Sequence, residues 1–284
     1  MTTIDQPGIY DMPVADYLAD PVPGGSLSQS GANRLLPPSC PARFRWWADN
    51  PPAPTATFDF GHAAHRLILG AGPDIVVVDA DDWRTKAAQQ ARKDAHEAGQ
   101  VPLLRADYEQ AQAMETAVRK HPIAGALFEP GAGTPERSLF WVDEISGIWR
   151  RARLDWLPAH RGQGRFVVPD YKTCRSADPE TLQRAIWDYR YNQQAAWYLN
   201  GIAELAHDPL ATFVFVFQEK EPPYLVTVAE PDPASLRIGR WHNRRAIETY
   251  HDCMTADHWP GYADDVELIP LPAWVENRYL EEAL

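Results

Sequence analysis

Two short acidic motifs in the second half of the chain carry residue types suited to hydrolysing a phosphodiester bond. Asp155 follows a stretch of alternating basic and apolar residues, and Asp170 comes after a loop, in Asp170-Tyr171-Lys172. Hard divalent cations bind carboxylate and carbonyl oxygens, and a bound cation can neutralise phosphate charge and activate water. We therefore expect Asp155 and Asp170, on neighbouring strands, to share one ion. The Lys172 ammonium would orient the water or stabilise charge on the phosphate.

The spacing of Asp-x-Lys suits a β-strand, in which alternate residues point to one face. The Tyr171 side chain would then point away from Asp170 and Lys172, while its backbone carbonyl could turn toward the metal. Taken alone, this motif is common, and an exposed ion pair at a strand end usually explains it. Here the apolar run 166–168 precedes it, which indicates that the acid and the lysine lie at the end of a core strand.

Alternating apolar and polar residues predict strands around these motifs. The expected elements are, in chain order, strands over 139–142, 148–157 and 165–168, a helical region over 178–207, strands over 212–217 and 224–229, and a helix from 232. Within 148–157, period-two alternation places Arg153 and Asp155 on one face and Arg150 and Leu154 on the other. Two adjacent strands would each finish on an acid.

The first part of the chain is expected to be extended and helical. Helices are predicted over 26–36, 60–69, 85–98 and 107–120, the last two as an antiparallel pair. His65 lies in the second of these helices, among small and apolar residues. We expect an N-terminal arm over 1–55 and one larger domain over 56–284, with a helical insertion at about 84–121.

Composition limits the class of protein. The 284 residues, 45% of them hydrophobic, are enough for one large domain with an arm. No apolar run is long enough to span a membrane, and the first residues lack a signal-peptide pattern, so we expect a cytoplasmic protein without a membrane partner. The three cysteines, Cys40, Cys174 and Cys253, encode neither a disulfide framework nor a zinc ribbon. They are also too few for the four ligands of an iron–sulfur cluster.

The formal net charge of -12 argues against a nucleic-acid partner, because phosphate binding relies on lysine and arginine. A protein with an acidic metal site can nevertheless confine its basic residues to one groove. In the arm, Arg34, Arg43 and Arg45 lie beside Trp46 and Trp47, which offer stacking surface for an unpaired base. We expect this arm to contact DNA.

A second basic stripe recurs at helical spacing and consists of Arg237, Arg240 and Arg244. Phosphate binding is one explanation, but a solvated helix face is the better one.

Four ordered motifs together resemble a known family. They are Gly61-x-x-x-His65, Arg153-x-Asp155, Asp170-x-Lys172 and Gln194-x-x-x-Tyr198, and they resemble the motifs of the RecB-type branch of PD-(D/E)XK nucleases. Within that branch, residues 171–173, 176–179 and 191–198 and the arm from Ser26 to Pro41 are similar to the phage exodeoxyribonuclease VIII (RecE) C-terminal nuclease domain. The similarity is weakest over 85–120 and in the C-terminal segment.

The resemblance implies a role for each motif residue. Asp155 and Asp170 would ligate the metal, the Tyr171 carbonyl would complete the coordination sphere, and Lys172 would serve the attacking water. His65 would be a further ligand, although a lone histidine on an apolar helix is more often a core residue. Mg²⁺ or Mn²⁺ in a two-metal site is implied, and imidazole suits Mn²⁺ somewhat better.

Supporting roles are expected for several further residues. Gln194 and Tyr198 share a helix face, where they would contact the DNA backbone or hold the lysine; an ordinary amphipathic helix explains them equally well. Arg153 belongs to the motif of Asp155 and is expected to support the site or bind DNA. Glu136 precedes the first strand of the hairpin, where related nucleases often carry an additional acid. The nearby Asp143 and Glu144 are better explained as a solvated turn.

The expected fold is an α/β, restriction-endonuclease-like central mixed β-sheet flanked by helices. The resemblance implies a processive exonuclease that degrades linear double-stranded DNA in phage-type recombination. It would leave a single-stranded tail for an annealing protein and assemble as a ring-shaped homo-oligomer. The alternatives are an endonuclease or single-strand nuclease with the same site, and an inactive DNA-binding or assembly protein. The intact acids and lysine weigh against inactivity, because a scaffold has no need for two neighbouring carboxylates that repel each other.

Overall fold

Strands and helices alternate along the chain in this computed structural model, which describes residues 3–50, 56–159 and 165–282. The strands are β1 (Gly8–Tyr10), β2 (Leu27–Ser28), β3 (Ile75–Val78), β4 (Val101–Leu104), β5 (Gly133–Val142), β6 (Trp149–Pro158), β7 (Val167–Cys174), β8 (Thr212–Glu219) and β9 (Val226–Ala229). The helices are α1 (Val14–Leu18), α2 (Gln29–Leu35), α3 (Pro41–Asp49), α4 (Ala56–Leu69), α5 (Lys86–Glu97), α6 (Arg105–Lys120), α7 (Pro122–Leu127), α8 (Pro179–Asp188), α9 (Tyr191–Leu205), α10 (Pro233–Ala256) and α11 (Ala273–Glu282).

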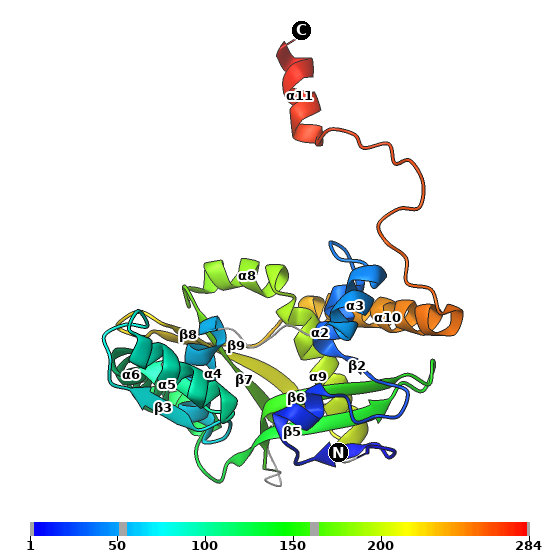
Figure 1. Cartoon of the computed structure of the whole chain (residues 1–284). Coiled ribbons are helices and arrows are strands. Elements are labelled where there is room, and N and C mark those ends of the chain that lie inside the picture. The colour runs from blue at the N-terminus through cyan, green and yellow to red at the C-terminus, as the bar shows by residue number, and fades with distance from the viewer. Residues whose placement is uncertain (1–2, 51–55, 160–164, 283–284) are drawn as a thin grey trace.

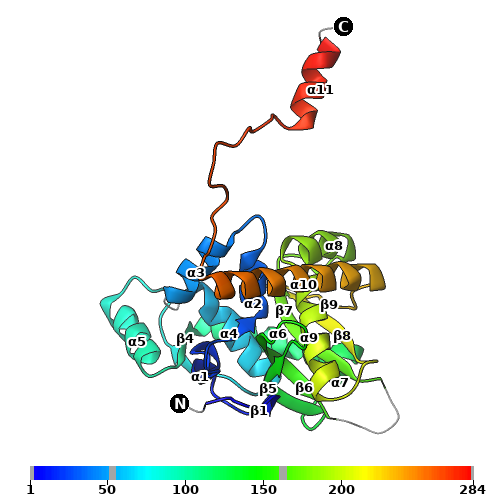
Figure 2. The same cartoon turned by 90° about the vertical axis from the view of Figure 1, so that its right-hand side faces the viewer.

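Two mixed sheets form the centre of the molecule. One has the strand order β1-β5-β6-β2 and the other β7-β8-β9, and each contains both parallel and antiparallel pairs. Strands β6 and β7 lie next to each other where the two sheets meet (Figures 1 and 2). Helix α9 packs on β5, β6 and β8 and is itself packed against α10, while α4 contributes to the core around β6 and β7. The expected mixed α/β fold flanked by helices is confirmed, with its strands divided between adjacent sheets.

The alternation predicted for β6 is present. Arg150, Ala152 and Leu154 are buried against the core, while Arg153 and Asp155 on the other face are only partly covered. The buried face of β6 packs with α9, whose Trp197 is fully buried. The core therefore fixes the direction in which the Asp155 carboxylate points.

Both acid-bearing strands continue past their acids, so the expectation that each ends on its acid is wrong. Strand β6 continues from Asp155 to Pro158, and Asp170 lies in the middle of β7. The reason is strand pairing: β7 is matched with β8 along its whole length, with Asp170 opposite Phe215 and Lys172 opposite Phe217. Polar residues can continue a strand where a neighbour supplies ladder hydrogen bonds.

The insertion differs from the expected helix pair. Strand β4 separates α5 from α6 and pairs in parallel with β3, and both helices pack on this small sheet while α6 also lies against α4. Figure 2 shows α5 and α6 well apart. The short run of β4 contains Pro102, which normally argues against a paired strand, and this explains why the sequence did not reveal it.

The first residues of the chain join the larger sheet. Strand β1 pairs with β5 and β2 pairs with β6. Helix α2 lies within the predicted range 26–36 and begins after Ser28, whose side chain accepts a hydrogen bond from the Gly31 backbone. At the other end, α11 stands away from the sheets on an extended segment (Figure 1). Within the part of the chain described here, none of the helices combines the length and apolarity needed to cross a bilayer.

Gly239→Ala should destabilise the fold, because α9 and α10 meet at their backbones there. A Cβ placed at Gly239 would lie 2.2 Å from the carbonyl oxygen of Asn192. Overpacking of this kind lowers the free energy of unfolding by about 1–3 kcal/mol. The matched control is Gly61→Ala in α4, where a Cβ would meet open space; this change should raise stability by up to ~1 kcal/mol. Urea unfolding of both variants checks the pair, and equal effects would contradict the close approach.

Candidate active site

Asp155 joins the two sheets through the backbone of β7. Its Oδ2 accepts a hydrogen bond of 2.8 Å from the backbone N–H of Tyr171. The carboxylate takes the place of a strand partner at this position, so the peptide between Asp170 and Tyr171 is held against Asp155. This contact brings the two acidic motifs together.

Asp170 is 1% exposed and is held from two directions. Gln194 Nε2 donates a hydrogen bond of 2.8 Å to Asp170 Oδ1, and Lys172 Nζ lies 2.5 Å from Oδ2. The second contact joins a charged ammonium to a carboxylate oxygen at hydrogen-bonding distance, so both oxygens of Asp170 are engaged within the protein. The Lys172 ammonium also lies 5.7 Å from the centre of the Tyr191 ring.

Burial and mutual repulsion perturb both acids. Burial raises the pKa of Asp155 to about 6 against the opposing attraction of Lys172. Burial, followed by the charge of Asp155, raises the pKa of Asp170 to about 6. Burial opposes the charge of Lys172, but Asp170 and Asp155 outweigh it and raise its pKa above the usual value. The site therefore holds two buried carboxylates that repel each other, and a bound cation would relieve this repulsion.

Without metal, the contribution of Asp155 and Asp170 to stability should fall as pH rises from about 4 to about 7. Folded Asp155 and Asp170 keep their protons up to a pKa of about 6, against 3.8 for the unperturbed carboxyl groups. At these two acids the folded state thus binds more protons in this window, so raising the pH lowers their contribution to stability, whereas His65, whose pKa is lowered to about 4, acts in the opposite direction. Asp155→Asn removes one titrating group and its repulsion of Asp170, so its stability should decline less. Urea unfolding in EDTA across this range measures the difference, and parallel curves would contradict the assigned shifts.

His65 on α4 faces the same acids. Its Nδ1 lies 3.7 Å from Asp155 Oδ2, and its ring packs edge-on against the Tyr171 ring at 5.1 Å between centroids. Burial, followed by the charge of Lys172, lowers the pKa of His65 to about 4. A neutral imidazole has a free lone pair, which is the form that ligates metals.

Glu136 lies directly across the β5–β6 hairpin from Asp155. Its neighbours Pro135 and Arg137 pair with Trp156 and Leu154, and Glu136 itself has a left-handed φ of 57°. Such a conformation is unfavourable for a residue with a side chain and is concentrated at functional sites.

Arg153 fixes the side chain of Glu136. The guanidinium donates to Glu136 Oε2 at 2.6 Å, to Ser138 Oγ at 2.7 Å and to the Met12 carbonyl at 3.0 Å. Arg153 is therefore engaged within the protein. Its contacts hold a third acid near Asp155, whose pKa Glu136 helps to raise.

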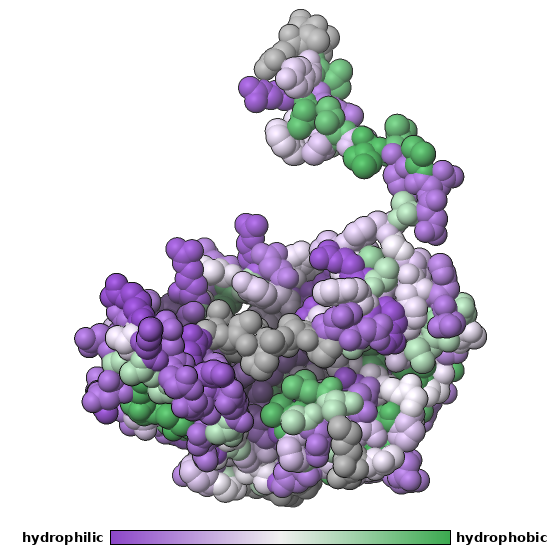
Figure 3. Space-filling model, viewed as in Figure 1, coloured by the Kyte–Doolittle hydropathy of each residue, from purple (hydrophilic) through white to green (hydrophobic). Residues whose placement is uncertain are grey.

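A pocket of 950 Å³ opens beside these residues, lined by α1, α4, the loop after α4 and β5. Its lining includes His65, Glu136 and Arg153, which it shares with the site, and the apolar Val14 and Leu18 of α1. Figure 3 shows a hollow in this face between the hydrophilic insertion and an apolar patch over α1. A cleft large enough for part of a substrate therefore adjoins the acids through His65 and Glu136, which line it.

The donor atoms suit a hard divalent cation, but the side chains are not preassembled around one. Carboxylate oxygens, a backbone carbonyl and a neutral imidazole are the appropriate donors, and the Asp170 oxygen that pairs with Lys172 is buried. Among the described residues, no three His, Cys, Asp or Glu side chains converge as a metal cluster. The Lys172 ammonium, paired with Asp170, supplies the neutralising charge in this arrangement.

His65→Ala should raise the Mg²⁺ or Mn²⁺ concentration needed for half-maximal DNA cleavage by about tenfold or more, while the rate at saturating metal falls less. The expected cause is a lost ligand, which additional metal partly compensates. His62→Ala, one turn earlier on α4 and lining the same pocket, is the control and should leave the metal dependence unchanged. Unchanged metal dependence in His65→Ala, with a lower melting temperature, would show that His65 is a packing residue of the core and not a metal ligand.

The remaining helix residues of the motifs lie within the same cluster. Tyr198 shares a side-chain hydrogen bond with Gln194 and, through burial, has a pKa raised well above the usual value. Gln194 in turn contacts Asp170 rather than Lys172. Through these contacts α9 positions the Asp170 carboxylate.

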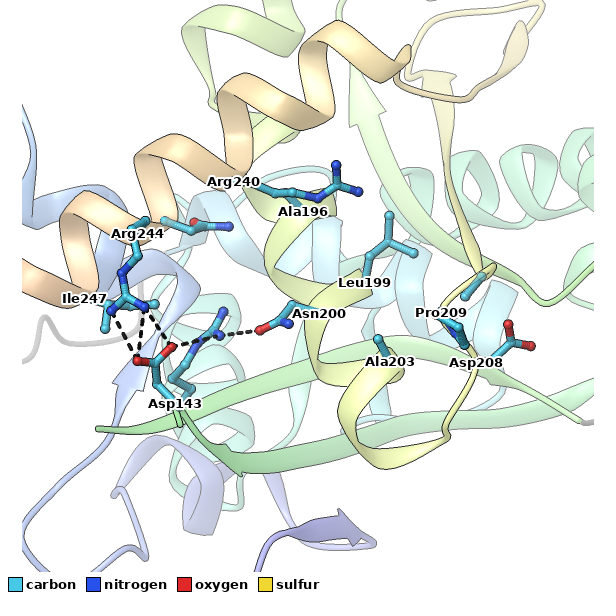
Figure 4. Close-up of a pocket in the computed structure, with 13 residues that line it drawn as sticks. Asp143, Ala196, Leu199, Asn200, Ala203, Asp208, Pro209, Arg240, Arg244 and Ile247 are labelled. Carbon is cyan, nitrogen blue, oxygen red and sulfur yellow. Dashed lines mark hydrogen bonds and ion pairs between the residues drawn. The ribbon is translucent and has the colours of Figure 1, made fainter. Parts of the chain in front are cut away.

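The basic stripe on α10 is not a uniform solvated face. Arg244 binds Asp143 bidentately at 3.1 Å, and Asp143 is only 9% exposed, so the expected solvated turn is wrong at this residue. Both line a separate pocket of 320 Å³ with Arg150 and Arg240 (Figure 4). None of the residues expected to perform chemistry lines this pocket.

Two of the three arginines expected to contact DNA from the arm have different surroundings. Arg45 is paired with Asp49, whereas Arg43 donates to the Tyr262 hydroxyl at 2.9 Å.

Two residues near the site had no role assigned from sequence. Tyr191 lies in a motif stretch, but only the fold shows its ring beside Lys172. Ser138 pairs with Arg153 across the hairpin. A cross-strand contact of this kind leaves no local signal in the sequence.

Comparisons with known proteins agree with the fold and with the superfamily that the motifs resemble. A family described as a PDDEXK-like domain of unknown function (DUF3799) matches residues 46–272, which include every motif residue named above. No curated protein matches the chain. A solved structure of a candidate exonuclease from Eubacterium rectale is similar, with a TM-score of 0.57 and 12% sequence identity over 88% of this chain and 92% of that chain. At this identity the likeness concerns the fold.

Proposed function

The chain belongs to the DUF3799 family of PDDEXK-like domains, within the PD-(D/E)XK nuclease superfamily, and from this premise we propose that it is a metal-dependent nuclease that hydrolyses DNA phosphodiester bonds. One observation carries the proposal: Asp155, Asp170 and Lys172 meet at a buried junction of two strands beside an open pocket. Each of the three has the chemistry that this reaction needs.

PDDEXK nucleases generally use divalent metal ions such as Mg²⁺. In this chain Asp155, Asp170, the Tyr171 carbonyl and His65 would hold the ion, which when bound supplies charge neutralisation and activates water. We extend the proposal to a two-metal site with Mg²⁺ or Mn²⁺, because Glu136 adds a third acid opposite Asp155.

The protein residues have separable tasks in this proposal. Gln194 holds one oxygen of Asp170 and thereby aims the other into the site. Arg153 holds Glu136 in its left-handed conformation. Lys172 is partly exposed and donates hydrogen bonds to the attacking water or to a phosphate oxygen as charge develops.

We further propose that the substrate is linear double-stranded DNA, degraded from an end as in phage-type recombination. The support is the resemblance of residues 171–173, 176–179 and 191–198 to the RecE nuclease domain, together with the name of the similar Eubacterium rectale structure. A ring-shaped homo-oligomer, an annealing protein as partner and a cytoplasmic location belong to the same proposal.

A cleavage assay tests the activity and its mode together. The substrates are linear duplex labelled at the 5′ or the 3′ end, closed circular duplex and single strand, each with Mg²⁺, Mn²⁺ or EDTA. We expect cleavage of linear duplex with either metal, none in EDTA, and resistance of the closed circle. The labelled end that is released first gives the polarity.

Other outcomes would support the alternatives. Cleavage of closed circles would indicate an endonuclease, and cleavage of single strand alone a single-strand nuclease. DNA binding without cleavage under every condition would mean an inactive binding or assembly protein.

A further inference from the structure

Three arginines and two tryptophans converge on a second surface, at α2, α3 and the turn between α8 and α9. Arg34, Arg43, Arg190, Trp46 and Trp47 line a pocket of 610 Å³ there. None of these residues belongs to the acidic cluster. The volume falls within the range of about 300–1,000 Å³ typical of ligand sites.

The positive charge of this pocket is not neutralised by acids. Many other arginines are paired with carboxylates, including the neighbouring Arg45 with Asp49. Among the residues that the structure describes, the three pocket arginines have no such pair. The acid in the pocket lining, Asp188, is bound by Arg184 at 3.2 Å. In a protein with a net charge of -12, this is a local site for an anion.

The arginines have neutral partners instead. Arg43 donates to the Tyr262 hydroxyl, Arg190 donates to the Pro37 carbonyl, and the Arg34 guanidinium lies 4.2 Å from the centre of the Trp47 ring. These contacts orient the guanidinium groups without removing their charge. The guanidinium groups can therefore still bind phosphate.

Trp46 supplies a flat apolar surface in the same place. Its side chain is 67% exposed, although an indole of this size is normally largely buried. An exposed tryptophan among unpaired arginines suits a ligand with both an aromatic face and negative charge. An unpaired nucleotide has both, whereas the bases of a duplex have their faces stacked on one another.

The chain links this pocket to the candidate active site. Arg190 has a left-handed conformation with φ 54° and lines the pocket, while the next residue, Tyr191, places its ring 5.7 Å from Lys172 Nζ. Tyr189, which is exposed, lies 5.6 Å from Tyr191 between ring centroids. Two aromatic rings therefore flank Arg190 in the chain, and one of them lies beside Lys172.

We propose that this pocket binds an unpaired nucleotide of single-stranded DNA, with its base stacked on Trp46 and its phosphates on Arg43 and Arg190. The proposal rests on the proposed nuclease function and adds a substrate contact outside the acidic site. The strand bound here is the single-stranded DNA that enters or leaves the site past Tyr191.

Fluorescence anisotropy of labelled oligothymidylate with the full chain in EDTA tests this directly, because no cleavage interferes. Trp46→Ala should weaken binding by about tenfold, from the loss of one stacked base. Arg43→Gln should also weaken binding and should lower the slope of log affinity against log salt by about 0.7 per lost phosphate contact. Trp274→Ala on the distant α11 and Arg105→Gln on α6 are matched controls and should bind as wild type.

Each result either supports or overturns the proposed nucleotide site. Wild-type binding by both pocket variants, with melting temperatures unchanged, would overturn the proposal. So would an equal loss of affinity for blunt duplex in Trp46→Ala, because stacking requires an unpaired base. A wild-type protein that binds oligothymidylate through Trp46 but cleaves nothing with Mg²⁺ or Mn²⁺ would overturn the nuclease function and leave this site standing.

Discussion

Asp155→Asn and Asp170→Asn should each reduce cleavage of linear DNA by about 10³-fold or more. The two carboxylates meet at the β6–β7 junction, where Asp155 holds the Tyr171 backbone and Asp170 pairs with Lys172. A metal ion contributes several kcal/mol to the stabilisation of the transition state, and each 1.36 kcal/mol is a factor of ten in rate. Asparagine keeps the shape and one oxygen of each side chain, so the loss of cleavage rate measures the contribution of the negative charge. Single-turnover cleavage with Mg²⁺ and with Mn²⁺ gives the rates.

The matched control for these variants is Asp143→Asn. Asp143 is also a buried acid in an ion pair with an arginine, but it lines the separate pocket behind α9. We expect Asp143→Asn to lower the melting temperature and to leave the cleavage rate of the folded protein close to that of wild type. Near-normal rates in Asp155→Asn or Asp170→Asn would show that the site has been placed wrongly.

Elements with a local signal were predictable from the sequence. The period-two pattern of β6 gave the facing of Arg153 and Asp155, because a one-residue shift would expose its whole buried face. Helix starts after Ser28, Asp178 and Asp232 follow from side chains that cap backbone N–H groups. The order of the four motifs was sufficient to identify the superfamily.

Features that depend on distant partners were not predictable. Strand β7 extends past its acid because β8 pairs with it throughout, and β4 forms despite Pro102 because β3 lies beside it. Asp143 is buried by Arg244, which is far along the chain. The position of Glu136 opposite Asp155 depends on the register of the hairpin, which its own neighbours in sequence do not specify.

Lys172→Gln should slow the chemical step by about 10²-fold or more and leave metal and DNA binding in place. An ammonium cannot ligate a cation, so its removal takes away hydrogen-bond donation to the water or the phosphate and not a metal ligand. Lys172 also neutralises Asp170 and Asp155 in the absence of metal. Losing that charge should leave the acids free to attract a divalent ion, so metal affinity should hold or increase. Calorimetry of metal binding and single-turnover cleavage at saturating metal measure the two effects separately.

Lys172→Arg distinguishes a general need for positive charge from a need for a compact ammonium. The guanidinium keeps the charge, but it is a planar fork that cannot occupy the space between Asp170 and the Tyr191 ring in the same way. We therefore expect little rescue by arginine. Lys93→Gln on α5, which removes an exposed and paired ammonium, should have no effect on either measurement. If Lys172→Gln lost metal binding but cleaved at the wild-type rate at saturating metal, Lys172 would shape the site and take no part in the reaction.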